Sequence, residues 1–301
     1  MGQFIRSSLI KDRTTATEIL KVDLPTNPLS HLIISMDGYN VTDEATLAEI
    51  LAFINKVEVS HLGTSIISLE SEDLFALNAY LYKHNPILTQ NVATDNAARC
   101  LSLIVPFGRK IFDPTECFPA TKKGELTLTL NMTVPATSLD NSTLNIEAVE
   151  LLEAAPTQYL KATMLSVAAP GATGDNDVDL PIGNDILAVQ IRMTTFPTTS
   201  SHTYGVDTAK VLVDNKEFGY SLARAQCLVG DNIFKVSSLP RTIAAFGDVV
   251  PANIVWLDYD PVKDGNWLLQ TSGKSSVKVR LGMGVNEATV LSVLELVKVG
   301  A

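Results

Sequence analysis

Two segments that lie far apart in the chain, residues 124–153 and residues 275–299, each begin with a strand in which apolar and polar residues alternate. In each segment an alternating strand is followed by a turn-rich connection and then by a second strand. The corresponding apolar positions of the first strands are Leu126, Leu128 and Leu130, and Val277, Val279 and Leu281. Because neighbouring strand residues point to opposite faces, each triplet should line a buried face. The correspondence indicates an internal repeat.

The first half of the chain contains further segments with a period of two. They predict strands at residues 17–23, 29–39, 56–60 and 100–106. Two segments have a helical period instead. Residues 42–55 place Leu47, Ile50, Leu51 and Ile54 on one face, with Thr42 or Asp43 as the cap, and residues 71–82 do the same with Leu74, Leu77 and Leu81. We therefore expect strands with two helices inserted between them.

The second half repeats this order of elements. Strands are predicted at residues 159–167, 186–196, 206–214 and 253–259, a Gly/Asp-rich loop at residues 169–179 and a short helix at residues 220–227. In both halves an apolar strand leads to an Asp-Pro turn, Asp113-Pro114 or Asp260-Pro261, and then to a long connection. The connection at residues 113–123 has no periodicity, and such connections are often interaction surfaces, so it is a candidate contact region.

Many short strands without strict strand–helix alternation favour a β-sandwich over a parallel α/β fold. We predict an all-β chain of two tandem eight-stranded jelly-roll β-sandwiches, with short helices in the loops. Residues 154–156 mark the boundary. The predicted domains are an N-terminal arm, residues 1–16, a first jelly roll, residues 17–155, and a second jelly roll, residues 156–301. A length of 301 residues suits two domains of about 150 residues each.

The charge of the chain restricts its partners. A net charge of −10 repels a polyanion, so we expect no specific nucleic-acid recognition. No apolar run approaches the roughly 18 residues of a membrane-spanning helix, and we expect no secretion signal. The arm is locally basic through Arg6, Lys11 and Arg13, which would suit an anionic surface; the alternative is a frayed, solvated terminus.

Candidate chemistry is sparse, and we expect no catalytic, cofactor-binding or metal-binding residues and no cofactor. The four histidines, His31, His61, His84 and His202, are dispersed and none has metal-ligand spacing to a cysteine. The three cysteines, Cys100, Cys117 and Cys227, are odd in number and widely spaced, which favours reduced, packed thiols.

Two groups of residues leave a binding role open. Asp175, Asp177 and Asp179 alternate as ligands of a calcium clip between subunits would, but a solvated loop is the favoured explanation. Trp256 and Trp267 flank the second Asp-Pro turn and would stack on a sugar if exposed, but Trp256 lies in an apolar strand, which favours core packing.

With this order of elements from Thr17 to Val299, the sequence resembles the double jelly-roll major capsid proteins of tailless icosahedral viruses. That lineage includes corticovirus, tectivirus and adenovirus hexon-type coats. The sequence resembles the small corticovirus-like members most, because strands such as KVEVSHLG (residues 56–63) and KVLVDNKEF (residues 210–218) are each followed by a short helix. No short motif defines this family, so the likeness is one of architecture.

The resemblance implies a non-enzymatic shell protein of the virion, assembled in the host cytoplasm. It implies a homotrimer of nearly hexagonal outline that packs against neighbouring trimers and against minor capsid or vertex proteins. It also implies a membrane or genome beneath the shell, in contact with an N-terminal arm at residues 1–13. The alternative is a carbohydrate- or receptor-binding β-sandwich; a jelly-roll enzyme is disfavoured because histidines and carboxylates do not cluster.

Overall fold

The computed structural model describes residues 2–41, 45–83, 95–134, 138–197, 201–236 and 253–300. Within them the chain divides into two compact units. Unit 1 comprises residues 2–161 and 298–300, and unit 2 comprises residues 162–236 and 253–297. In the parts of the chain that are described, no helix has the length and apolarity needed to cross a membrane. Thr42, Asp43 and His84 lie outside the described residues.

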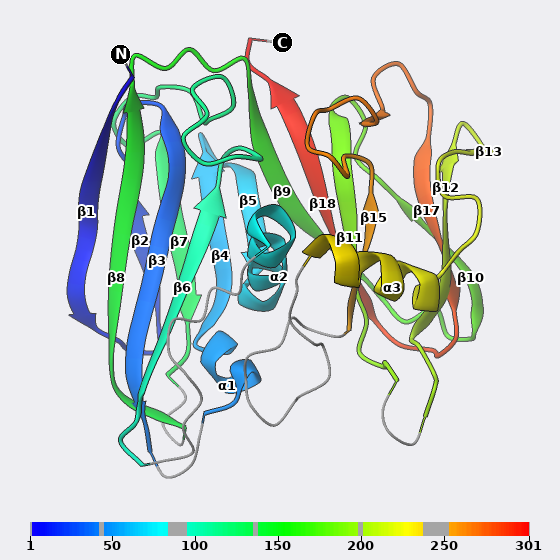
Figure 1. Ribbon diagram of the computed structural model, residues 1–301, viewed down its shortest axis with the longest axis horizontal. Coiled ribbons are helices and arrows are strands. Elements are labelled where there is room, and N and C mark those ends of the chain that lie inside the picture. The colour runs from blue at the N-terminus through cyan, green and yellow to red at the C-terminus, as the bar shows by residue number, and fades with distance from the viewer. Residues whose placement is uncertain are drawn as a thin grey trace. The chain divides into compact units, whose positions relative to one another are not determined.

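Unit 1 contains two antiparallel sheets that lie one behind the other in Figure 1. The first has the order β1-β8-β3-β6, formed by β1 (Gln3–Thr14), β8 (Leu139–Leu152), β3 (Leu29–Asn40) and β6 (Ala98–Pro106). The second has the order β5-β4-β7-β2, formed by β5 (Thr64–Glu70), β4 (Ile54–His61), β7 (Leu126–Met132) and β2 (Glu18–Asp23). This arrangement of the first eight strands is that of a jelly roll.

The core of unit 1 lies between the inner faces of these sheets. Alternate residues of each strand are completely buried, for example Leu32 and Ile34 of β3 and Leu128 and Leu130 of β7. Burial of a leucine-sized side chain stabilises a fold by about 1.5–3 kcal/mol. The period of two therefore fixes which face of each strand points inward.

Unit 2 has the same strand order. One sheet has the order β15-β11-β18-β9, formed by β15 (Ile254–Asp258), β11 (Asp185–Arg192), β18 (Thr289–Lys298) and β9 (Gln158–Val167), with β16 (Leu269–Gln270) also paired to β11. The other has the order β10-β17-β12-β13, formed by β10 (Gly174–Asp179), β17 (Val277–Met283), β12 (Val206–Val213) and β13 (Lys216–Glu217), with β14 (Ala223–Arg224) also paired to β12. The division between the units falls within β9.

The internal repeat predicted from the alternating segments is confirmed. Strands β7 and β8 close the first jelly roll, and β17 and β18 occupy the same positions in the second. All six corresponding apolar residues, Leu126, Leu128, Leu130, Val277, Val279 and Leu281, are buried. In unit 2 they belong to one cluster with Val189, Ile191 and Leu257. The predicted fold class, two jelly rolls with short helices between strands, is correct.

The three helices in the described part of the chain differ in how well the sequence predicted them. Helix α2 (Ser71–Tyr82) has the predicted limits. Helix α1 (Leu47–Leu51) is shorter than residues 42–55, because it starts after a capping box between Thr46 and Glu49 and because Ile54 already belongs to β4. A short helix was predicted at residues 220–227; helix α3 (Ala225–Val236) overlaps this range only at residues 225–227, so the predicted limits were wrong. Residues before Ala225 pair with β12 through β14 instead.

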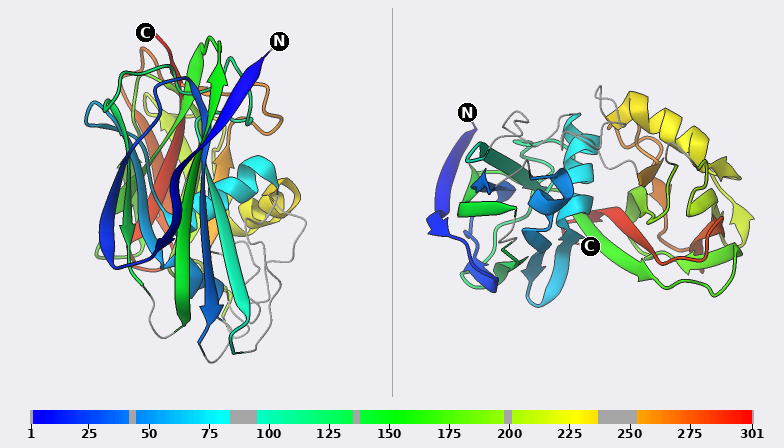
Figure 2. Two further views of the ribbon diagram at one scale, coloured as in Figure 1. Left: turned by 90° about the vertical axis from the view of Figure 1, so that its left-hand side faces the viewer. Right: turned by 90° about the horizontal axis from the view of Figure 1, so that it is seen from below.

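Three further expectations are corrected. Residues 3–14 are not a free arm: β1, the dark blue strand in Figure 2, is the edge strand of its sheet and pairs with β8 from Gln3↔Leu152 to Thr14↔Thr143. The predicted loop at residues 169–179 contains β10, which pairs with β17. Strand β5 was not predicted, because its buried run lacks a clean alternation. The predicted domain limits at residues 16 and 155 remain a prediction.

Candidate functional site

The registers of the strands bring several turns of unit 1 together at one end. His61 of β4 and Asp23 of β2 lie opposite the first residues of β7, while Gln3 of β1 lies opposite the end of β8. We call this region the turn end. It comprises residues 3–5, 24–31, 61–64, 107–125 and 150–153, and it includes the candidate contact region at residues 113–123.

A buried ion pair holds the connection between β6 and β7 in shape. Both carboxylate oxygens of Glu116 lie 2.9–3.0 Å from the Arg109 guanidinium, and one also accepts the backbone N–H of Arg109 at 2.7 Å. The two side chains are only 12% and 5% exposed. Gly108 is required here, because a Cβ atom at this position would lie 2.1 Å from the carbonyl oxygen of Glu116. The connection is therefore an ordered part of the unit.

Aromatic packing fixes the next part of the connection. Phe118 exchanges two backbone hydrogen bonds of 2.9 Å with Leu29. Its buried ring contacts Phe107, His61 and Tyr159 at centroid distances of 4.9–5.6 Å. Cys117 beside it is buried, which raises the pKa of its thiol to about 11, and the charge of Asp113 acts in the same direction.

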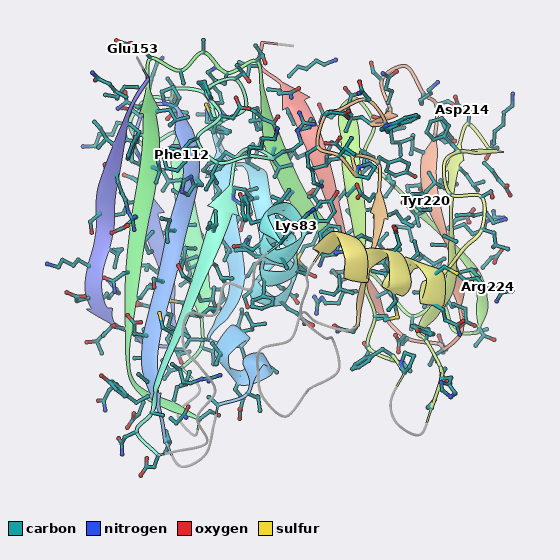
Figure 3. The ribbon with its side chains drawn as sticks, viewed as in Figure 1. Lys83, Phe112, Glu153, Asp214, Tyr220 and Arg224 are labelled. Atoms are coloured by element: carbon teal, nitrogen blue, oxygen red, sulfur yellow. The ribbon has the colours of Figure 1, made fainter. Side chains whose placement is uncertain are left out.

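The tip of this connection presents an aromatic ring to the surface. Phe112 is 46% exposed although its backbone has a φ of +63°, a region that bulky residues rarely adopt. Its N–H donates to Ser30 Oγ at 2.8 Å, and its ring contacts Phe4 and His31, each at a centroid distance of 5.3 Å. In Figure 3, Phe112 lies in the upper part of unit 1, below Glu153. The fold thus maintains a strained, half-exposed aromatic residue.

A second exposed apolar residue occupies the tip of the β4–β5 hairpin. Leu62 is 70% exposed with a φ of +49°, and Gly63 follows at +81°. The equivalent turn of unit 2 has Asp214 and Asn215 at +50° and +64°, which are residues that tolerate this conformation well. The comparison indicates that the turn itself does not require leucine.

Exposed lysines accompany these apolar residues. Lys110 precedes Ile111 and Phe112, and Lys122 and Lys123 lie beside Leu62. The connection is direct, since the Leu62 N–H donates to the Glu125 carbonyl at 2.9 Å and the Glu125 N–H donates to the Lys122 carbonyl at 3.1 Å. The turn end therefore places exposed lysines beside its apolar tips, and it also contains five carboxylates, those of Asp113, Glu116, Glu125, Glu150 and Glu153.

The β15–β16 connection of unit 2 is also organised by a carboxylate. Asp260 is fully buried, and its Oδ1 accepts the N–H of Gly265 at 2.8 Å. Val262 and Trp267 on this connection are 65% and 68% exposed. Tyr220 packs nearby, where its hydroxyl lies 3.1 Å from the Asp258 carbonyl oxygen.

The candidate cation ligands are engaged with cations of the protein. Asp175, Asp177 and Asp179 lie on one face of β10. Arg280 of β17 pairs with Asp177 at 2.5 Å and with Asp175 at 3.6 Å, while Lys278 pairs with Asp179 at 3.6 Å. The hydrogen bond from Arg280 is the main reason that the pKa of Asp177 is lowered. Among the described residues, no three His, Cys, Asp or Glu side chains are arranged to hold a metal ion.

The tryptophans, cysteines and histidines considered in the sequence analysis do not form a common site in the described residues. Trp256 is 1% exposed, which confirms core packing and leaves Trp267 alone at the surface. Cys117 is buried as expected, but the expectation of a packed thiol is wrong for Cys227, which is exposed on α3. His31 and His61 both lie at the turn end of unit 1, whereas His202 lies in unit 2.

No protein-family model matches this sequence, and no curated protein matches it significantly. Solved structures do match. The major capsid protein P2 of bacteriophage PM2 aligns over 100% of both chains, with a TM-score of 0.65 and 14% identity. The corresponding protein in the structure of Sulfolobus Turreted Icosahedral Virus aligns over 98% of this chain and 90% of its own, with a TM-score of 0.72 and 12% identity.

This chain has the fold of these viral major capsid proteins. The same likeness extends to VP54 of PBCV-1, with a TM-score of 0.66 and 10% identity over 98% of this chain and 94% of that one. The double jelly-roll fold predicted from the repeat is therefore shown by comparison as well as by strand order. At these identities the comparisons concern the fold.

Proposed function

We propose that this protein is a major capsid protein that forms homotrimers tiling an icosahedral virus shell. The observation that carries the proposal is the repeated strand order, matched over the full length of the PM2 capsid protein. Two jelly rolls in one chain let three chains present six similar barrels, and such a trimer packs on a hexagonal net. The partners are neighbouring trimers and minor capsid or vertex proteins, and assembly takes place in the host cytoplasm.

The described residues favour a structural role over catalysis. The most buried charged groups at the turn end, Arg109 and Glu116, are engaged in a structural ion pair. Carbohydrate binding was the alternative. Of the two tryptophans that would have formed a stacking platform, Trp256 is buried, so nothing at this site favours that function.

Purified protein tests the main proposal. We expect a trimer of about 97 kDa, three times the 32.4 kDa of the chain, by mass photometry, and a nearly hexagonal outline by negative-stain microscopy. A stable monomer that binds glycans on an array would contradict the capsid proposal.

We assign the contact with the inside of the virion to the turn end rather than to a free arm. Exposed apolar tips next to lysines suit the interface of an anionic membrane, where apolar side chains insert and cations meet the headgroups. Phe112 and Leu62 supply the apolar part, and Lys110, Lys122 and Lys123 supply the charge. A genome is the less suitable partner, because the exposed apolar side chains of Phe112 and Leu62 can insert into a bilayer but gain nothing from a phosphate backbone.

Liposome sedimentation tests this contact. Leu62→Asn should weaken binding of the trimer to vesicles that contain anionic phosphatidylglycerol, and should leave the fold intact because asparagine tolerates a positive φ. Leu222→Asn is the matched control, since Leu222 is 57% exposed but lies in unit 2, away from these turns in sequence. Equal binding by both variants and the wild type would overturn the membrane contact.

A further inference from the structure

His31 is unusual for a histidine because its side chain is almost completely buried at the turn end. The residue is 3% exposed. Its ring packs against the edge of Phe112, which in turn packs against Phe4 at the start of β1. Since Phe112 has a φ of +63°, these contacts and one hydrogen bond are what hold it in a strained conformation.

Ser30 connects the imidazole to the strained residue. Its Oγ accepts the Phe112 N–H at 2.8 Å and lies 2.9 Å from His31 Nδ1. A hydroxyl has one hydrogen, which Ser30 can donate to Nδ1 only while that nitrogen is unprotonated. We call Phe4, Ser30, His31 and Phe112 the latch.

The charged groups around His31 disfavour its cationic form. On β1, Arg6 presents a like charge and is paired with Glu147 of β8. Directly opposite His31 lie Val149 of β8 and Pro106 of β6, which carry no charge. The nearby carboxylate of Glu150 is held by Ser7 and Asn27.

The remaining neighbouring charges belong to the connection. Lys110 is exposed, and the carboxylate of Asp113 is bound to Thr115. Among the charged groups of these elements, none is a carboxylate placed to compensate a positive imidazole.

We propose that the latch is an acid-sensitive lock: protonation of His31 releases the tip of the β6–β7 connection and the start of β1 together. A charged imidazole would be both desolvated and next to Arg6, and it can be hydrated only if the Phe112 ring moves away. That movement also frees the strained backbone of Phe112 and removes the ring partner of Phe4. The lock is a property of the single chain and does not depend on the proposed capsid function.

The direction of the pH dependence follows from the imidazole. Burial, and next the charge of Arg6, lower the pKa of His31 from 6.5 to about 4 in the closed latch. In the opened form the pKa of His31 returns to the higher value of 6.5. The closed form therefore has its full stability above pH 6.5 and is progressively destabilised as the pH falls toward 4. The opening equilibrium should increase by about 80-fold between pH 6.5 and pH 4, and by up to about 300-fold in total from well above pH 6.5 to well below pH 4.

Hydrogen–deuterium exchange of the full chain, corrected for the intrinsic pH dependence of exchange, tests the lock. In the wild type we expect peptides covering residues 3–8 and 109–113 to lose protection together between pH 6.5 and 4. His31→Asn should abolish this acid effect, because the amide oxygen can accept the Ser30 hydrogen bond and does not titrate. His61→Asn is the matched control at the same end and should behave as the wild type.

Two results would overturn the lock: no acid-dependent loss of protection in the wild type, or the same loss in His31→Asn. If the latch of His31→Asn is already open at neutral pH, the acid effect is measured in Arg6→Gln instead. Removal of the like charge should raise the pKa of His31 and reduce the acid effect, so an unchanged effect in Arg6→Gln would contradict the proposal. None of these readings requires shells, so a failure here is separate from a failure of the capsid assignment.

Discussion

Single residues at the turn end have roles that the polar and apolar pattern does not reveal. Glu116 and Arg109 look like ordinary surface charges in the sequence, yet both are nearly buried and make several charge-assisted hydrogen bonds. Phe112 and Leu62 look like core residues, yet they are exposed at a positive φ. In each case the role depends on neighbours that are distant in the chain.

The buried ion pair gives a prediction for one carboxylate. Glu116→Ala should lower the free energy of unfolding by about 3–5 kcal/mol, because it leaves the Arg109 guanidinium buried without its partner. Glu217→Ala is the control, since the Glu217 side chain is 51% exposed in its pair with Lys210 and such pairs contribute about 0–1 kcal/mol. Urea denaturation of both variants would measure the difference, and equal losses would contradict the structural role of Glu116.

Two glycines predict opposite effects of the same substitution. Gly108→Ala should destabilise the protein by about 1–3 kcal/mol, because the added methyl group meets the backbone of Glu116. Gly230→Ala has open space around it and lies within α3, where alanine is favoured by about 1 kcal/mol. Thermal unfolding of the pair should show a lower midpoint for the first and a higher one for the second. A tolerated Gly108→Ala would mean that the connection shifts easily.

At the scale of elements, strand β1 changes the meaning of the N-terminus. Its length and basic residues suggested an arm, because 12 mostly exposed residues give no buried face to recognise. In the structure β1 covers the edge of β8, and its own edge carries Arg6, Lys11 and Arg13 with two register shifts. Charges and bulges on an edge strand discourage pairing with other chains.

Deletion of residues 2–14 should therefore destabilise unit 1 instead of sparing the fold, which reverses the expectation for an arm. The loss exposes the hydrogen-bonding edge of β8 and uncovers Val149 and Leu151, which are 1% and 7% exposed. Circular dichroism and limited proteolysis would detect the change, with deletion of Gly2 alone as the control. A deletion variant as stable as the wild type would show that β1 adds little.

At the scale of the whole molecule, the repeat predicts that equivalent positions respond alike. Leu128→Asp in β7 and Val279→Asp in β17 each place an unpaired charge in a sandwich core, which costs several kcal/mol. Each variant should unfold its own unit first. Proteolysis read by mass spectrometry would locate early cleavage in residues 2–161 for the first variant and in residues 162–297 for the second. The reverse pattern would contradict the assignment of the two cores.

Much of the architecture could be predicted from the sequence. Alternation identified β2, β3, β4, β7, β8 and the closing strands of the second unit, because a half-buried strand records its inward face in every second residue. The order of those strands, repeated twice, was sufficient to predict two jelly rolls. Strands β1, β5 and β10 were not predicted. β1 and β10 are mostly exposed and β5 is continuously buried, so none of them shows a clear alternation of apolar and polar residues.

The alternating pattern by itself determined the two sandwiches and their correspondence, since burial of one strand face is a local and periodic constraint. Only the tertiary structure determined which residues meet at the turn end and on the β10–β17 pair. It determined that Arg109 is buried against Glu116, that Phe112 meets His31 and Phe4, and that Asp175 and Asp177 face Arg280. These contacts join residues from separate strands and connections, and no periodic pattern records which partners a folded chain brings together.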